Sequence, residues 1–194
     1  MNAILYINKP GCQWRLLPRE FGLWQTVYYY FRKWKLEGVI EDILDTLHSL
    51  VRKIVGRDES PSMGIIDSRS VKTSHYADPS CKGVDGNKMV KGRQEHVVVD
   101  TLGQQMAIAA HEANLHDSKG APKVIEKLDH KLSRLTKILA DGRYCGTLGD
   151  RVSEKFARLE NFRRLTIDHE YLADTAEAMV QLAFIQIMLS KFYQ

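Results

Sequence analysis

The sequence has few cysteines, and their placement does not support a disulfide framework or a zinc site. Cys12, Cys81 and Cys145 are odd in number, far apart and without a Cys-x-x-Cys pair. A chain with this cysteine usage fits a reducing compartment, and we expect a cytoplasmic protein.

Long hydrophobic runs are also missing. The most apolar stretch, residues 176–192, contains Gln181, Gln186 and Lys191, which makes it too polar to span a bilayer. The N-terminus lacks the basic segment and the small-residue cleavage site of a signal peptide. We therefore expect no membrane partner.

What the sequence does have is an uneven charge distribution. The net charge of the 194 residues is +4, and hydrophobic residues make up 44%, enough for a sizeable core. Residues 1–57 hold nine Lys and Arg against five Asp and Glu, so this region carries the whole net charge. The distribution favours a polyanion such as DNA as a partner there, although a solvated basic face without a partner is the alternative.

Two helices are predicted in this basic region, over residues 23–36 and 39–55, with Gly38 between them. Arg32, Lys33 and Lys35 lie in the first helix and are candidates for DNA contact. The pair fits a helix-turn-helix-like unit and a plain helical hairpin equally well. The polar segment of residues 56–61 marks a domain boundary, which divides the chain into residues 1–57 and 58–194.

Beyond this boundary the pattern changes from helical to α/β. The predicted elements are a strand at 63–66, a hairpin of strands at 95–101 and 104–110, a helix at 116–132, a strand at 135–140 and a helix at 149–165. This order predicts an α/β, ribonuclease-H-like mixed sheet with flanking helices, preceded by a short helical N-terminal region.

Asp67 and Asp141 each close one of the short apolar runs that we predict as strands. Two carboxylates at the ends of neighbouring strands would form a site for Mg²⁺ or Mn²⁺, and paired divalent metals catalyse phosphoryl transfer on nucleic acids. Each residue taken alone is more typical of a helix cap or a turn than of a metal site. The combination, in this element order, favours the metal site.

The residues after Asp67 are rich in cations. We predict that Arg69, Lys72, Lys88, Lys91 and Arg93 contact the phosphate backbone of DNA. A solvated loop over residues 73–93 is the alternative. Histidines at 96, 111 and 116 are interpreted as structural or exposed, because no His-x-x-x-His pair is present.

Several ordered motifs resemble the DDE transposases of bacterial insertion sequences. They are the segments 11–18 (GCQWRLLP), 24–34 (WQTVYYYFRKW), 64–72 (GIIDSRSVK), 91–103 (KGRQEHVVVDTLG), 113–117 (ANLHD), 139–142 (LADG) and 161–165 (NFRRL). By this resemblance, Asp67 and Asp141 are the first two metal-binding catalytic acids.

The third acid departs from the family pattern. An alignment of residues 156–159 with the family's helix places Ser153 at the catalytic position, and Glu154 follows one residue later. Only 13 residues separate Asp141 from Glu154. We therefore expect an N-terminally truncated and internally shortened member, in which Glu154 is a displaced third acid.

The resemblance implies a DNA transposase that uses Mg²⁺ or Mn²⁺ and acts on double-stranded DNA at transposon ends and targets. A catalytically defective remnant that folds and only binds DNA is the main alternative. A metal-dependent nuclease of the same fold is a third reading. The sequence leaves the oligomeric state open, a homodimer included.

Overall fold

The computed structural model describes residues 1–86, 88–115, 117–128, 131–140 and 158–192. Its helices are α1 (Asn2–Asn8), α2 (Trp24–Leu36), α3 (Val39–Ile54), α4 (Asp117–Glu126), α6 (Arg163–Thr166) and α7 (Ala173–Leu189), with short 3₁₀ turns at Trp14–Leu16, Arg19–Phe21, Pro79–Cys81 and Ser190–Phe192. The strands are β1 (Met63–Lys72), β2 (Gly83–Asp85), β3 (Val90–Asp100), β4 (Gln105–Glu112) and β5 (Lys137–Ala140).

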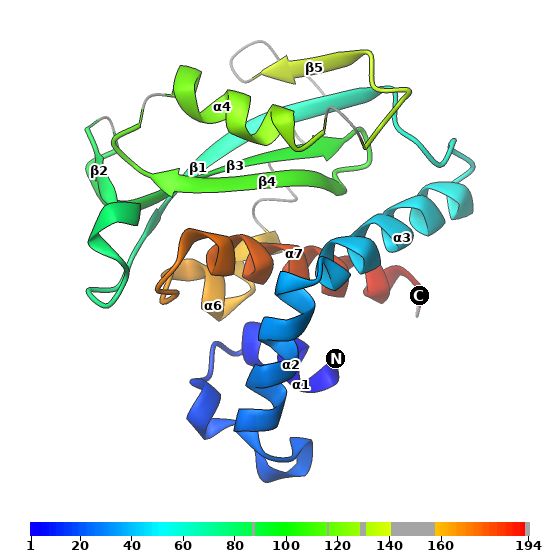
Figure 1. Ribbon diagram of the computed structural model, residues 1–194. Helices are drawn as coiled ribbons and strands as arrows, with labels where there is room; N and C mark the ends of the chain where they lie inside the picture. The colour runs from blue at the N-terminus through cyan, green and yellow to red at the C-terminus, as the bar shows by residue number, and fades with distance from the viewer. Residues whose placement is uncertain (87, 116, 129–130, 141–157, 193–194) are drawn as a thin grey trace.

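A mixed sheet forms the centre of the molecule. β3 pairs antiparallel with β1, β2 and β4, while β5 pairs parallel with β1 on its other side. The β3–β4 hairpin closes at Asp100, whose carboxylate oxygen Oδ1 accepts the amide N–H groups of Leu102 and Gln104. Parallel pairing of β5 requires a crossover from β4, and α4 lies within that connection (Figure 1).

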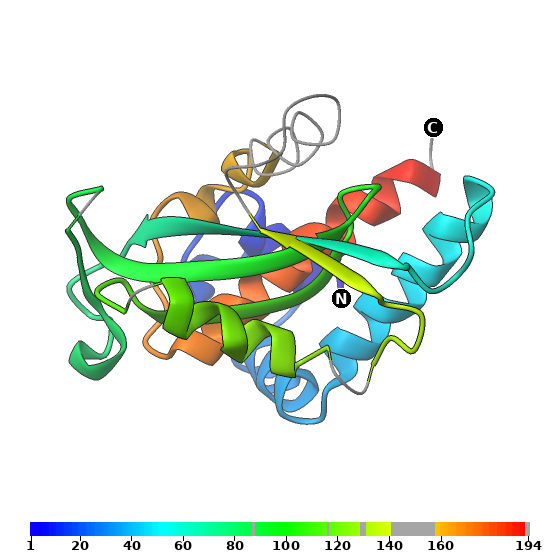
Figure 2. The same cartoon turned by 90° about the horizontal axis from the view of Figure 1, so that it is seen from above.

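Helices cover both faces of the sheet. α4 lies on one face, and α7 lies on the other with α3 beside it, as the two views show (Figures 1 and 2). β1 alternates between these faces: Ile65 packs into the core with α7, and Ile66 packs into the core with Val124 and Leu128 on the α4 side. The predicted α/β class with a mixed sheet and flanking helices is therefore confirmed, and the topology is that of a ribonuclease-H-like domain.

The helical N-terminal region shares the α7 core. Ile4, Phe31 and Leu44 from α1, α2 and α3 are buried in the same cluster as Val97 of β3 and Phe184 of α7. Residues 1–57 thus pack against the sheet domain through α7. The domain boundary at residue 57 stays a prediction.

Several predicted boundaries were wrong, for one physical reason. β1 continues six residues beyond Ile66 to Lys72, and β3 begins at Val90 within the predicted loop, since these two segments pair over nine residues from Gly64↔Asp100 to Lys72↔Gly92. Polar residues in these segments gave no local strand signal, and only the long-range pairing makes them extended. Among the described helices, none is both long and apolar enough to cross a membrane.

Candidate functional site

Asp67 lies within β1 rather than at its end, which corrects the sequence prediction. It is half-buried, and because side chains alternate along a strand it belongs to the face of Ile65, toward α7. Its Oδ1 accepts the amide N–H of Ser68 at 2.7 Å. This contact fixes one oxygen of the carboxylate relative to the backbone of the strand.

The register of β1 with β5 defines what stands beside Asp67. The parallel ladder runs from Met63↔Lys137 to Ile66↔Ala140. Ala140 is the last described residue before the gap, and the next residue in the sequence is Asp141. β5 therefore ends at the level of Asp67, while Asp141 and Glu154 themselves lie outside the described residues.

Arg69 lies two residues beyond Asp67 on the same face of β1. Its Nε donates to Oε2 of Glu95 at 2.7 Å, and the Arg69 side chain is 19% exposed. Its Nη2 is buried and makes no described hydrogen bond. Burial raises the pKa of the Glu95 carboxyl, against the opposing effect of the Arg69 charge. Glu95 thus fixes the orientation of the Arg69 guanidinium, and the buried Nη2 of Arg69 has no described hydrogen-bond partner.

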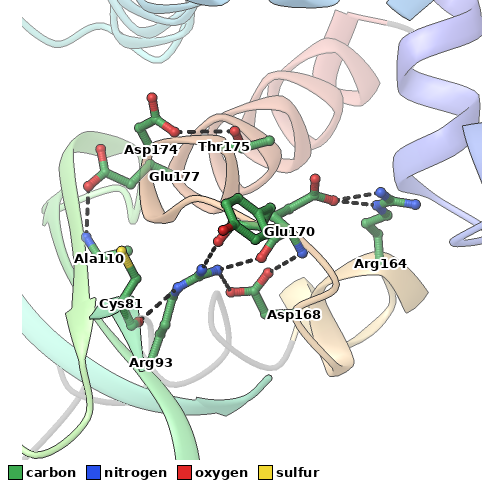
Figure 3. A network of polar contacts seen from close by, with 10 residues as sticks. Cys81, Arg93, Ala110, Arg164, Asp168, Glu170, Asp174, Thr175 and Glu177 are labelled. Atoms are coloured by element: carbon green, nitrogen blue, oxygen red, sulfur yellow. Dashed lines mark hydrogen bonds and ion pairs between the residues drawn. The ribbon is translucent and has the colours of Figure 1, made fainter. Parts of the chain in front are cut away.

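Arg93 does not contact DNA in this fold, which corrects a second prediction. It is fully buried, and its guanidinium donates to the Asp168 carboxylate and to the backbone carbonyls of Glu170, Tyr171 and Cys81 (Figure 3). A fully engaged, buried guanidinium serves to join β3 to the segment before α7.

The network continues through Glu170 to the N-terminal region. Oε1 of Glu170 accepts from Nε of Arg164 at 2.8 Å and from its Nη2 at 2.6 Å (Figure 3). Nη1 of Arg164 also donates to the backbone carbonyl of Cys12. Burial raises the pKa of Glu170, which the neighbouring Arg164 charge opposes. Residues 164–170 therefore connect β3, through Arg93, with the loop at Cys12 in the N-terminal region.

Three predicted DNA contacts, Lys72, Lys88 and Lys91, have exposed side chains near one end of the sheet. Lys72 and Lys91 come from adjacent positions in the β1–β3 ladder, and Lys88 lies in the β2–β3 turn. These lysines are available for phosphate contact, unlike Arg93.

In the N-terminal region, Arg32 and Lys33 are exposed on α2. Lys35 is 14% exposed at its side chain, and its Nζ donates to Asp174 at 2.7 Å and to Thr175 at 3.1 Å. Lys35 thus links α2 to the start of α7. On α3, Asp42 is exposed and Asp45 pairs with Lys131, and this negative charge disfavours α3 as a helix that enters a DNA groove.

The described candidate histidines, His96 and His111, do not lie on the Asp67 side of the sheet. His96 pairs with Ser68 in the ladder and so lies on the α4 face, opposite to the Asp67 face. Its ring stacks on that of His111 with centroids 5.0 Å apart, and both rings lie against Gly120 of α4. Their interpretation as structural residues fits this placement, whereas His116 lies outside the described residues.

The described residues include one candidate ligand for a divalent metal. Asp67 offers a hard carboxylate ligand of the kind that Mg²⁺ and Mn²⁺ prefer. In the part of the chain that the structure describes, no group of three or more His, Cys, Asp or Glu residues could hold a metal ion. The carboxylate of Asp67 fits such an ion as one ligand.

Sequence reasoning missed two buried acids. Glu95 supports Arg69, and Asp100 accepts from His48 at 3.1 Å and pairs with Arg52, which ties α3 to the β3–β4 turn. A signal was present, because Asp100 directly follows the apolar run 97–99 and Glu95 lies two residues before it, and acids so close to a buried strand require partners. The identity of that partner depends on the fold.

Two family models match consecutive parts of the chain. The model for transposases of the IS4/5 family matches residues 1–44, and the transposase DDE domain matches residues 58–151. The second match includes Asp67 and Asp141 and ends before Glu154. The chain therefore belongs to the DDE transposases of insertion sequences. No curated protein and no solved structure matches it.

Proposed function

We propose that this transposase binds double-stranded DNA and cleaves and joins its phosphodiester bonds with Mg²⁺ or Mn²⁺. The observation that carries the proposal is the parallel pair Ile66↔Ala140, since each of these residues is followed by an aspartate. Asp67 and Asp141 would hold the metal, with Glu154 as the candidate third acid. Cytoplasmic residence, with access to DNA, accords with the cysteine usage.

A bound divalent metal would stabilise the charge that develops on the oxygens of the reacting phosphate. The residues of the chain have supporting roles. Ser68 N–H orients the Asp67 carboxylate, and Glu95 holds Arg69 so that its remaining N–H groups can meet a phosphate oxygen. Lys72, Lys88 and Lys91 would contact the DNA backbone next to this point.

The test uses the purified chain and a plasmid that carries the inverted repeats flanking its own gene. With Mg²⁺ or Mn²⁺ we expect strand cleavage at the repeat ends. Asp67→Asn and Asp141→Asn should each reduce the rate by about a hundredfold or more, since a carboxylate ligand is lost. Asp42→Asn, which alters an exposed acid on α3, is the matched control and should retain the rate.

Two results would change the proposal. Equal cleavage by the wild type and Asp67→Asn would remove Asp67 from the site. If the chain binds the plasmid but cleaves it with neither Mg²⁺ nor Mn²⁺, the alternative of a catalytically defective remnant is supported. Glu154→Gln then decides the third acid: a rate unchanged from the wild type shows that Glu154 takes no part.

A further inference from the structure

A hollow of about 660 Å³ lies along the outer side of α2, the helix that Figure 1 places away from the sheet. Its lining residues come from one side of the helix and include one acid, Glu37, at the C-terminal end: Gln25, Tyr28, Tyr29, Arg32, Lys33, Leu36 and Glu37. We refer to it as the α2 hollow. The transposition chemistry proposed above uses none of its aromatic residues.

Tyrosine rings in the α2 hollow are exposed and yet held in place. Tyr29 is 60% exposed and Tyr28 is 37% exposed. The Tyr28 ring packs edge-on against Trp14 at 5.0 Å, and the Tyr29 ring packs edge-on against Tyr30 at 5.4 Å. Rings that are already ordered lose little conformational entropy when a planar group stacks on them.

Cations follow the tyrosines by one turn of the helix. Arg32 and Lys33 are both exposed, and one turn corresponds to a rise of about 5.4 Å. Glu37 lies 3.9 Å from Lys33, and both side chains are about half exposed, so water screens this pair. Lys35 points elsewhere, to Asp174. The α2 hollow therefore combines flat rings with positive charge on one stripe.

A second copy of this chain is a poor occupant for the α2 hollow. A two-fold interface brings the same stripe of both copies together, which would gather two copies of Arg32 and of Lys33 within one small contact. Leu36 is the single large aliphatic side chain in the lining, so the apolar gain from such a contact would be small.

We propose that the α2 hollow binds unpaired nucleotides of single-stranded DNA, with a base stacked on Tyr29 and phosphates at Arg32 and Lys33. Aromatic rings with adjacent cations are the usual means of holding single strands. Duplex DNA hides the faces of its bases inside the stack and offers only phosphates, sugars and base edges, on which a tyrosine ring cannot stack. The inference rests on the DNA partner of the proposed function and specifies which form of DNA this surface takes.

The experiment measures fluorescence anisotropy of the full chain with a labelled single strand of about 16 nucleotides, and with a hairpin duplex of the same composition. Tyr29→Ala should weaken binding of the single strand by roughly tenfold, since one base loses its stacking partner. Tyr29→Phe should bind as the wild type does. Tyr171→Ala is the matched control, because Tyr171 is 59% exposed and lies outside α2.

Three outcomes overturn the inference. The first is an unchanged single-strand affinity of Tyr29→Ala. The second is an equal loss for single strand and duplex, which would show phosphate contact alone. The third is a concentration-dependent dimer in light scattering that Tyr29→Ala abolishes, which would assign the surface to a second copy. If the wild type cleaves DNA but Tyr29→Ala binds the single strand with unchanged affinity, only this inference fails. If the wild type binds the single strand and Tyr29→Ala weakens that binding, but no cleavage is seen, only the catalytic proposal fails.

Discussion

Ile66 of β1 and Ala140 of β5 are partners in a parallel ladder, and each directly precedes an aspartate in the sequence. Antiparallel pairing of β1 with β3 continues six residues past this point, to Lys72. Asp67 is therefore held within a paired strand on one side, while the described part of β5 stops beside it. Pairing with β3 holds the backbone at Asp67 in place, and the Ser68 amide holds one oxygen of its carboxylate.

Metal binding should depend on Asp67 even without DNA. We expect Mn²⁺ to raise the melting temperature of the wild type, because an ion that binds only the folded state stabilises it, and EDTA to reverse the shift. Asp67→Asn should raise the dissociation constant for Mn²⁺ by at least about tenfold. Isothermal titration calorimetry measures it, with Asp42→Asn as the control. An unchanged constant would contradict the proposed ligand.

Arg93 should be essential for stability and not for DNA affinity. Arg93→Met leaves the Asp168 carboxylate buried without its partner, and the free energy of unfolding should fall by about 3–5 kcal/mol. Urea denaturation measures this change. Lys91→Met alters an exposed side chain two residues earlier and should stay within about 0.5 kcal/mol of the wild type. If both variants change the free energy of unfolding by a similar small amount, the Arg93 network contributes little to stability.

The Asp100 contacts should appear as a pH dependence of stability. Burial alone would raise the pKa of Asp100, but hydrogen bonds and charge from His48, together with the Gln104 amide and Arg52, outweigh it and hold the pKa below its ordinary value. A carboxyl with a lowered pKa in the folded state adds stability above its unfolded pKa of about 3.9, and this stability is lost as the pH falls through the folded pKa.

Asp100→Asn should therefore be less stable than the wild type by about 3 kcal/mol near neutral pH. The gap should close as the pH falls below about 4. Urea unfolding at a series of pH values tests this, with Asp42→Asn as the exposed comparison. A gap that is constant with pH would mean that the ionised form of Asp100 has no special role.

Gly92 should not tolerate a side chain. A Cβ at this position would lie 1.9 Å from the carbonyl oxygen of Val71, within the β1–β3 ladder that positions Asp67. Gly92→Ala should lower the free energy of unfolding by about 3 kcal/mol. At Gly86 a Cβ would meet nothing within 4 Å, so Gly86→Ala is the control. Equal unfolding curves for the two variants would contradict the close approach.

Much of the fold could be predicted because its signals are local. The helices α2 and α3 were located to within about two residues from apolar spacing, and the hairpin from its two apolar runs and the turn at Gly103. β2 and the extended parts of β1 and β3 could not be predicted, because their residues are polar and become strands only through pairing with distant segments.

The candidate site was predicted only in part for a related reason. Charge can be counted in a sequence, but burial cannot, so Arg93 was grouped with exposed lysines although it lies inside the molecule. Lys35 was likewise grouped with Arg32, although its partner Asp174 is 139 residues away in the chain.

By itself, the sequence determined the class of this protein, the order of its elements and the two aspartates that follow apolar runs, since these depend on residue identity and short-range spacing. The tertiary structure decided the register that pairs β5 with β1 up to Ile66, and it decided which cations are buried in networks and which stay exposed. Pairing and burial depend on contacts between residues far apart in the chain. No local pattern specifies those contacts, because many pairings satisfy the same alternation and only packing of the whole core selects one.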